Sequence, residues 1–176
     1  WGNEPLSTLD FDFIHRIAGG ALAGDFDYTR TEVSLLRRTF LARFELRTAT
    51  TYVRTTGTPP VQRLADAGGL STVRGFSRRT LVGEQILAMR AEAPIPYDLL
   101  RRTRIPGLRA LGVQFVPWAD AGRDLDRDVW IHSLGLGVQK HWIGFGRAAN
   151  LRLDMAFPVG PDRPADAVFL LRFAGG

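Results

Sequence analysis

Apolar and polar residues alternate along most of this chain, and no other feature restricts its possible folds as strongly. Near the start, Leu9, Phe11 and Phe13 alternate with Asp10 and Asp12. A two-residue period is that of a β-strand with one apolar face. No run of eighteen uninterrupted apolar residues occurs, so a transmembrane helix is not expected. The pattern predicts an all-β chain.

Eight segments follow this period and are predicted to be strands. They span about residues 9–17, 25–36, 40–52, 84–95, 111–120, 130–142, 150–157 and 167–173. In the second segment Tyr28 shares a face with Arg30 and Glu32, which predicts either a bulge or different strand limits. Arg37-Arg38-Thr39 is predicted to turn the chain, and residues 54–83 form a long Gly- and Pro-rich loop.

The polar faces of these segments carry both signs of charge at alternate positions, as in Arg43-Glu45-Arg47 and in Arg152 with Asp154. Interspersed charges suit a polar lumen in which neighbouring strands pair their side chains. The mean hydropathy of −0.06 also fits, because alternating strands average out. We therefore predict an antiparallel transmembrane β-barrel, closed because backbone groups in lipid must be paired.

Trp130 and Trp142 mark the sixth segment, on the same face as Leu134 and Leu136. Twelve residues of extended chain span roughly 40 Å, and a tilt of about 40° reduces this to roughly 30 Å. The two rings are therefore expected in the aromatic girdles at the two membrane surfaces. The alternative is that both are core tryptophans of a soluble sheet.

Composition argues against several other functions. Lys140 is the lone lysine, so the net charge of +5 comes from arginines, which are spread through the strands. Nucleic-acid binding is therefore not expected. The chain has no cysteine, and His15, His132 and His141 are scattered without a neighbouring Ser or Asp in a recognisable order. We expect no catalytic site, no metal and no cofactor.

The loop carries the motif Val73-Arg74-Gly75-Phe76 after Gly68-Gly69, and five strand candidates follow it. This segment resembles the sixth extracellular loop of the bacterial surface antigen superfamily. The superfamily contains the BamA/TamA-type outer-membrane assembly factors and the barrel transporters of two-partner secretion. The resemblance implies a sixteen-stranded barrel preceded by POTRA domains. Residues 1–176 would then be the C-terminal half of that barrel domain.

The resemblance also implies roles for particular residues. In the family the loop arginine enters the lumen and pairs with acidic residues on the next two strands, which correspond here to Glu92 and Asp120. Both positions fall on the inward-facing side of their segments, which Arg90 and Trp118 share. Charge-assisted bonds from two carboxylates suit a guanidinium removed from water. Gly75 would allow a tight turn beside Arg74, and Phe76 would pack against the barrel wall.

The last predicted strand resembles the family's C-terminal signal, with Phe169, Leu171 and Phe173 at alternate positions. It departs from that signal because Ala174-Gly175-Gly176 follow the aromatic residue. The implied function is insertion, assembly or secretion of other proteins in the bacterial outer membrane. Partners would be outer-membrane lipids, client proteins, the remaining barrel strands and POTRA domains.

Two alternatives remain at this point. Eight strands are enough to close a self-contained small barrel with a structural or porin-like role. An enzyme built on a barrel is the other, although the sequence offers it no recognisable catalytic group. Pairing between the Leu9 strand and the Phe169 strand would favour the small barrel.

Overall fold

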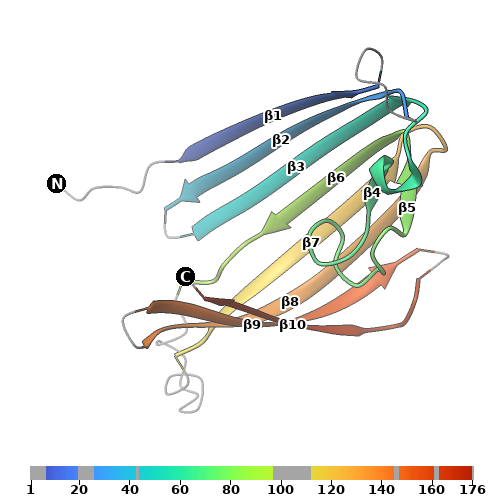
Figure 1. Cartoon of the computed structure of the whole chain (residues 1–176). Helices are drawn as coiled ribbons and strands as arrows, with labels where there is room; N and C mark the ends of the chain where they lie inside the picture. Colours follow the sequence, from blue (N-terminus) through green and yellow to red (C-terminus); the bar gives the residue numbers. More distant parts are fainter. Residues whose placement is uncertain are drawn as a thin grey trace.

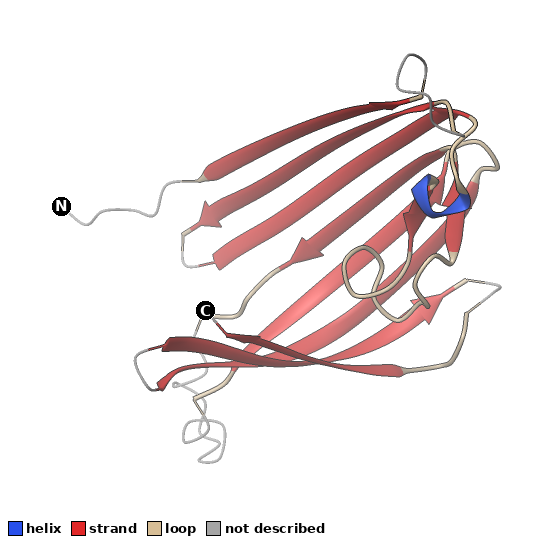
Figure 2. Ribbon diagram, viewed as in Figure 1, coloured by secondary structure: helices blue, strands red, loops and turns tan. Residues whose placement is uncertain are grey.

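The computed structural model describes residues 7–19, 26–42, 44–96, 112–144, 147–160 and 163–175, and these form an all-β structure. The strands are β1 (Thr8–Ala18), β2 (Tyr28–Leu41), β3 (Phe44–Gly57), β4 (Ala65–Ala67), β5 (Leu81–Gly83), β6 (Gln85–Glu92), β7 (Gln114–Asp124), β8 (Val129–Gly144), β9 (Arg147–Val159) and β10 (Val168–Gly175). One short 3-10 turn, η2 (Val61–Arg63), is the helical element of the described residues, as Figure 2 shows.

Eight of the strands form one antiparallel sheet in the order β1-β2-β3-β6-β7-β8-β9-β10. Figure 1 shows it as a single curved layer, with β4, β5 and the adjoining loop on its concave side. Strands β4 and β5 pair only with each other, as a separate small sheet. Over the described residues, the alternating pattern therefore produces one bent sheet, without two large layers stacked face to face.

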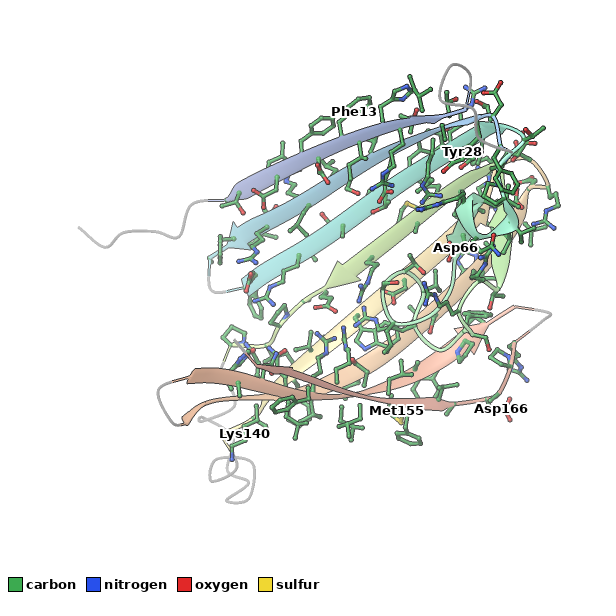
Figure 3. The ribbon with its side chains drawn as sticks, in the orientation of Figure 1. Phe13, Tyr28, Asp66, Lys140, Met155 and Asp166 are labelled. Atoms are coloured by element: carbon green, nitrogen blue, oxygen red, sulfur yellow. The ribbon has the colours of Figure 1, made fainter. Side chains whose placement is uncertain are left out.

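The two faces of the sheet differ as the alternation predicts. The convex face presents large apolar side chains to the surroundings, with Phe11 66%, Leu134 56% and Phe169 67% exposed. Figure 3 shows the labelled Phe13 and Met155 pointing away from the concave side. The concave face carries charged side chains such as Glu92, Asp120 and Arg152. Successive side chains of a strand point to opposite sides, so one sequence pattern generates both surfaces.

The second strand corrects the sequence interpretation. β2 continues to Leu41, so Arg37-Arg38-Thr39 lies inside the strand and does not form the predicted turn. Its register is continuous with β1 over residues 28–38 and with β3 along its full length, with no bulge. Arg38 pairs across from Arg47 on the concave face. The turn prediction failed because the strand accommodates adjacent arginines on its two faces, with Arg38 on the concave face and Arg37 on the opposite one.

The chain reverses instead near Ala42, which has a positive φ of 55°. As a result Phe40 belongs to β2 and pairs with Glu45, on the opposite face from Phe44. The predicted third strand, which grouped Phe40 with Phe44, was therefore wrong at its start. The predicted loop also begins later than residue 54, because β3 continues to Gly57.

A small apolar cluster lies between the loop and the concave face. Its members are Val53, Ala65, Ala67, Val73, Phe76, Leu81, Ile86 and Ile131. Strands β3, β6 and β8 supply the floor of this cluster, and the loop with β4 and β5 supplies its cover. Burial of these side chains holds the loop against the sheet. The core is thus local and positions the loop tip.

The sheet is open. Among the described residues β1 pairs with β2 alone, and β10 pairs with β9 alone. Each outer strand therefore has one edge without a neighbouring strand. No helix in the described part of the chain is long and apolar enough to cross a membrane.

Candidate functional site

The loop tip descends into the concave side of the sheet and is buried there. Val73, Arg74, Gly75 and Phe76 are all buried, and Arg74 has no exposed surface. The loop stabilises this shape internally, since the Gly69 amide donates to the Phe76 carbonyl at 3.1 Å. The loop is therefore folded onto the sheet and does not extend from it.

In the motif Val73-Arg74-Gly75-Phe76, the two apolar residues pack against other apolar side chains, and Arg74 and Gly75 approach the sheet closely. Val73 and Phe76 belong to the apolar cluster under the loop. Gly75 has φ of +86°, a backbone conformation that favours glycine. A Cβ added there would lie 2.9 Å from Pro158 Cγ and 3.0 Å from Ala156 Cβ. The tip thus rests directly on β9, and Arg74 is brought to the sheet surface beside it.

Arg74 makes most of its polar contacts with one carboxylate. Its Nε and Nη2 donate to the two oxygens of Asp120, each at 2.7 Å, and its backbone amide donates to Asp120 Oδ2 at 3.0 Å. Its Nη1 donates to Glu92 Oε1 at 2.7 Å. The structure brings together the arginine and the two carboxylates that the resemblance implied. The bidentate arrangement with Asp120 is the strong, directional form of such a pair.

An aromatic ring completes the surroundings of this guanidinium. Arg74 Cζ lies 3.7 Å from the ring centroid of Trp118, which is a cation–π contact. Trp118 precedes Asp120 by two residues on β7, so both side chains point inward. The ring occupies space that is free because residue 135 is a glycine. A Cβ there would lie 2.2 Å from Trp118 Cζ2. Sequence analysis placed Trp118 inward but assigned it no role.

The ionic contacts extend well beyond Arg74. Arg152 donates to Glu92 Oε2 at 3.0 Å and to Asp154 Oδ1 at 2.8 Å, and Arg172 donates to Asp154 Oδ2 at 2.5 Å. Arg74 Nη1 lies 3.7 Å from Asp154 Oδ1. We call the set Arg74, Arg90, Glu92, Asp120, Arg152, Asp154 and Arg172 the ionic network. It joins the loop to β6, β7, β9 and β10.

Arg90 links the network to the loop backbone. Its Nη1 donates to the Ser71 carbonyl at 3.1 Å, and its Nε lies 3.5 Å from Asp120 Oδ1. Sequence analysis recognised the inward position of Arg90, Arg152 and Asp154 but did not connect them to Arg74. The alternation along each strand indicated which face of the sheet each of these side chains lies on. Their choice of partner depends on register and curvature, which parity does not specify.

The other predicted site residues lie away from this network. Trp130 is on the convex face, 36% exposed, and its ring stacks with His132 at a centroid distance of 5.4 Å. The side chain of Trp142 lies outside the described residues. Phe169, Leu171 and Phe173 on β10 are exposed on the convex side. The structure therefore separates an outward apolar set from the inward ionic set.

The chemistry available at the site is ion pairing that holds the loop against the sheet. Guanidinium groups stay protonated, and the network's carboxylates are engaged in ion pairs with them. Within the described ranges, no three His, Asp or Glu side chains are grouped in a way that would hold a metal ion. The arrangement fixes the loop position relative to four strands of the sheet.

Comparison with known proteins adds no family assignment: no protein-family model and no curated protein matches the chain.

Proposed function

We propose that this chain forms the C-terminal half of a bacterial outer-membrane β-barrel that inserts, assembles or secretes other proteins. The proposed class is the bacterial surface antigen superfamily of BamA/TamA-type factors and two-partner secretion transporters. The observation that carries the proposal is the loop arginine, fully buried on the concave face and bound by carboxylates from β6 and β7. A buried charge is costly unless opposite charges pair with it, so the burial of Arg74 at the loop tip depends on these carboxylates.

The convex face supports a lipid environment. Large apolar side chains cover it from β1 to β10, whereas the concave face is polar and ionic. Such a distribution is inverted relative to a soluble protein and matches a barrel with lipid outside and a polar lumen inside. Outer-membrane lipids are thus the first proposed partner, and the bacterial outer membrane is the proposed location.

The open edges support a larger barrel. Unpaired strand edges are not tolerated in lipid, so β1 and β10 require neighbours. The remaining strands of a sixteen-stranded barrel would supply them, with POTRA domains before them. A self-contained eight-stranded barrel needs β1 to pair with β10. In the described residues these strands pair only with β2 and β9, so we favour the larger barrel.

The proposed role is binding and conduction of client proteins, without catalysis and without nucleic acid. Client strands in an extended conformation would pair with a strand edge of the completed barrel, where main-chain bonds supply affinity. No cofactor is required for such a role. The ionic network would keep the loop in the lumen while clients are handled.

Substitution of the loop arginine tests this proposal. Arg74→Ala removes the charge that the two carboxylates bind, so we expect a barrel that still inserts but loses assembly or secretion of its clients. Its loop becomes accessible to protease, which limited proteolysis of intact cells measures. Arg78→Ala, an exposed arginine of the same loop, is the matched control and should retain activity. Unchanged activity and protease resistance in Arg74→Ala would contradict the proposal.

A further inference from the structure

A cavity of about 260 Å³ adjoins the ionic network on the concave face. Four arginines line it, Arg47, Arg90, Arg152 and Arg172, together with a single carboxylate, Glu92. These arginines come from β3, β6, β9 and β10. Residues far apart in the chain thus converge on one polar space. The pairing of Arg74 with Glu92 and Asp120 does not account for this space.

One donor at this cavity is buried and unused. Arg172 Nε is inaccessible and makes no hydrogen bond within the described part of the chain. Arg152 Nη2 is also buried, but it lies 2.8 Å from Asp154 Oδ1, so that carboxylate compensates its charge. Arg152 as a whole is 93% buried, since its exposed fraction is 7%. A buried donor without an acceptor is unfavourable, so Arg172 Nε points to a missing oxygen ligand.

The local charge points the same way. Arg47 is paired with Glu45 by two hydrogen bonds of 2.7 Å. Together with the ionic network this makes five guanidinium groups and four carboxylates, which leaves one positive charge. Arg38 lies across from Arg47 on the same face, and Asp10, in register with the cavity-lining Leu36, offsets it, so the excess of one positive charge is unchanged. An uncompensated charge with a low exposure favours the binding of an anion.

We propose that this cavity binds a small oxyanion, namely a carboxylate or phosphate group. Arginine forks match the geometry of both groups and donate to two oxygens at once. The cavity volume is more than enough to admit either group together with water and is below the range of drug-sized pockets. The inference does not depend on the proposed export role, because all the lining residues belong to this chain.

The test uses the full-length protein folded in detergent. Its unfolding temperature is measured with increasing sodium phosphate, or sodium acetate, against sodium chloride at equal ionic strength. We expect phosphate or acetate to raise the unfolding temperature where chloride does not. Arg172→Gln and Arg47→Gln should each raise the concentration needed for half of this effect about tenfold, as loss of one charge-assisted bond implies. Arg54→Gln, on the outward face of β3, is the control and should behave like the unchanged protein.

The outcomes are distinct. A response to phosphate alone assigns a phosphate ligand, and a response to acetate assigns a carboxylate. Equal responses in phosphate, acetate and chloride would overturn the inference, as would a specific response that both variants retain. Equal responses in the three salts would result if an acidic side chain from elsewhere in the barrel filled the cavity. Arg47 is at the partly exposed rim, so its variant keeps the test valid if Arg172→Gln does not fold.

Discussion

At the scale of single residues, Arg74 and its two carboxylates are not equivalent partners. Asp120 accepts three hydrogen bonds from Arg74. Glu92 accepts one from Arg74, and its other oxygen accepts one from Arg152. Asp120 is also the more buried of the two side chains. The loop position therefore depends chiefly on Asp120, and Glu92 serves as a bridge to the rest of the ionic network.

Neutralising each carboxylate should reveal this difference. We expect Asp120→Asn to reduce the stability of loop docking by about 3–5 kcal/mol, because a buried charge loses its main partner. Glu92→Gln should cost less, since Arg74 keeps Asp120. The measurement is the protease half-life of the loop in the folded protein. Asp166→Asn, at an exposed acid, is the control, and equal effects of the first two changes would contradict the assignment.

Gly75 offers a second test at this scale. Gly75→Ala should displace the loop tip, because its Cβ meets Pro158 and Ala156 in addition to the strained φ of +86°. Gly69→Ala is a closely matched control. It has φ of +87°, but its nearest contact would be an ordinary 3.5 Å. The exposure of Phe76, followed by collisional quenching or protease access, should rise in Gly75→Ala far more than in Gly69→Ala. Equal changes would show that backbone strain alone matters.

At the scale of elements, β7 and β8 are fitted to one another around Trp118. β7 supplies Trp118 and Asp120, and β8 supplies a glycine where the ring needs space. The Gly135 position also lies close to the Met155 carbonyl of β9. The inward glycines of β8 thus leave room for other side chains: Gly135 for the Trp118 ring, and Gly137 for Arg152 and Asp154 of the ionic network.

Filling this space should release the loop without touching it. Gly135→Ala is expected to push the Trp118 ring away from the Arg74 guanidinium and to destabilise the folded protein by about 1–3 kcal/mol, the usual cost of overpacking. Chemical unfolding in detergent measures this loss. The same change in a Trp118→Leu background should cost clearly less. If it costs as much there, the contact with the Met155 carbonyl is responsible and the account of the ring is wrong.

At the scale of the whole molecule, the sheet is open and its apolar side faces outward. Neither property suits residues 1–176 as an isolated soluble domain, because both edges and the convex face would contact water or other chains. These two properties follow from the same alternation that makes the concave side polar. They are the physical basis for proposing that further strands complete the barrel.

The half-barrel proposal predicts that the isolated chain aggregates when expressed alone and folds only together with the further strands that would complete the barrel. Size-exclusion chromatography in detergent and the shift in electrophoretic mobility on heating measure this directly. The matched sample is the same chain co-expressed with the remaining barrel strands. A monodisperse, heat-modifiable chain obtained without them would contradict the half-barrel proposal and would favour a self-contained barrel.

Much of this arrangement was predictable from local pattern. The two-residue period identified eight strands, their apolar faces and the inward position of Glu92, Asp120 and Trp118. Where both faces of a strand carry polar residues, as in β2, the period was too weak to locate its end. The family resemblance added the pairing of the loop arginine, which spacing alone would not have indicated.

What local pattern did not contain was the assembly of the ionic network. Arg152 meets Glu92 across sixty residues, and Arg172 meets Asp154 because β9 and β10 are paired in one register. Alternation is a property of neighbouring residues, so it assigns each side chain to a face. Which side chains meet on that face depends on register and on the curvature of the sheet, and these arise only when distant strands pair.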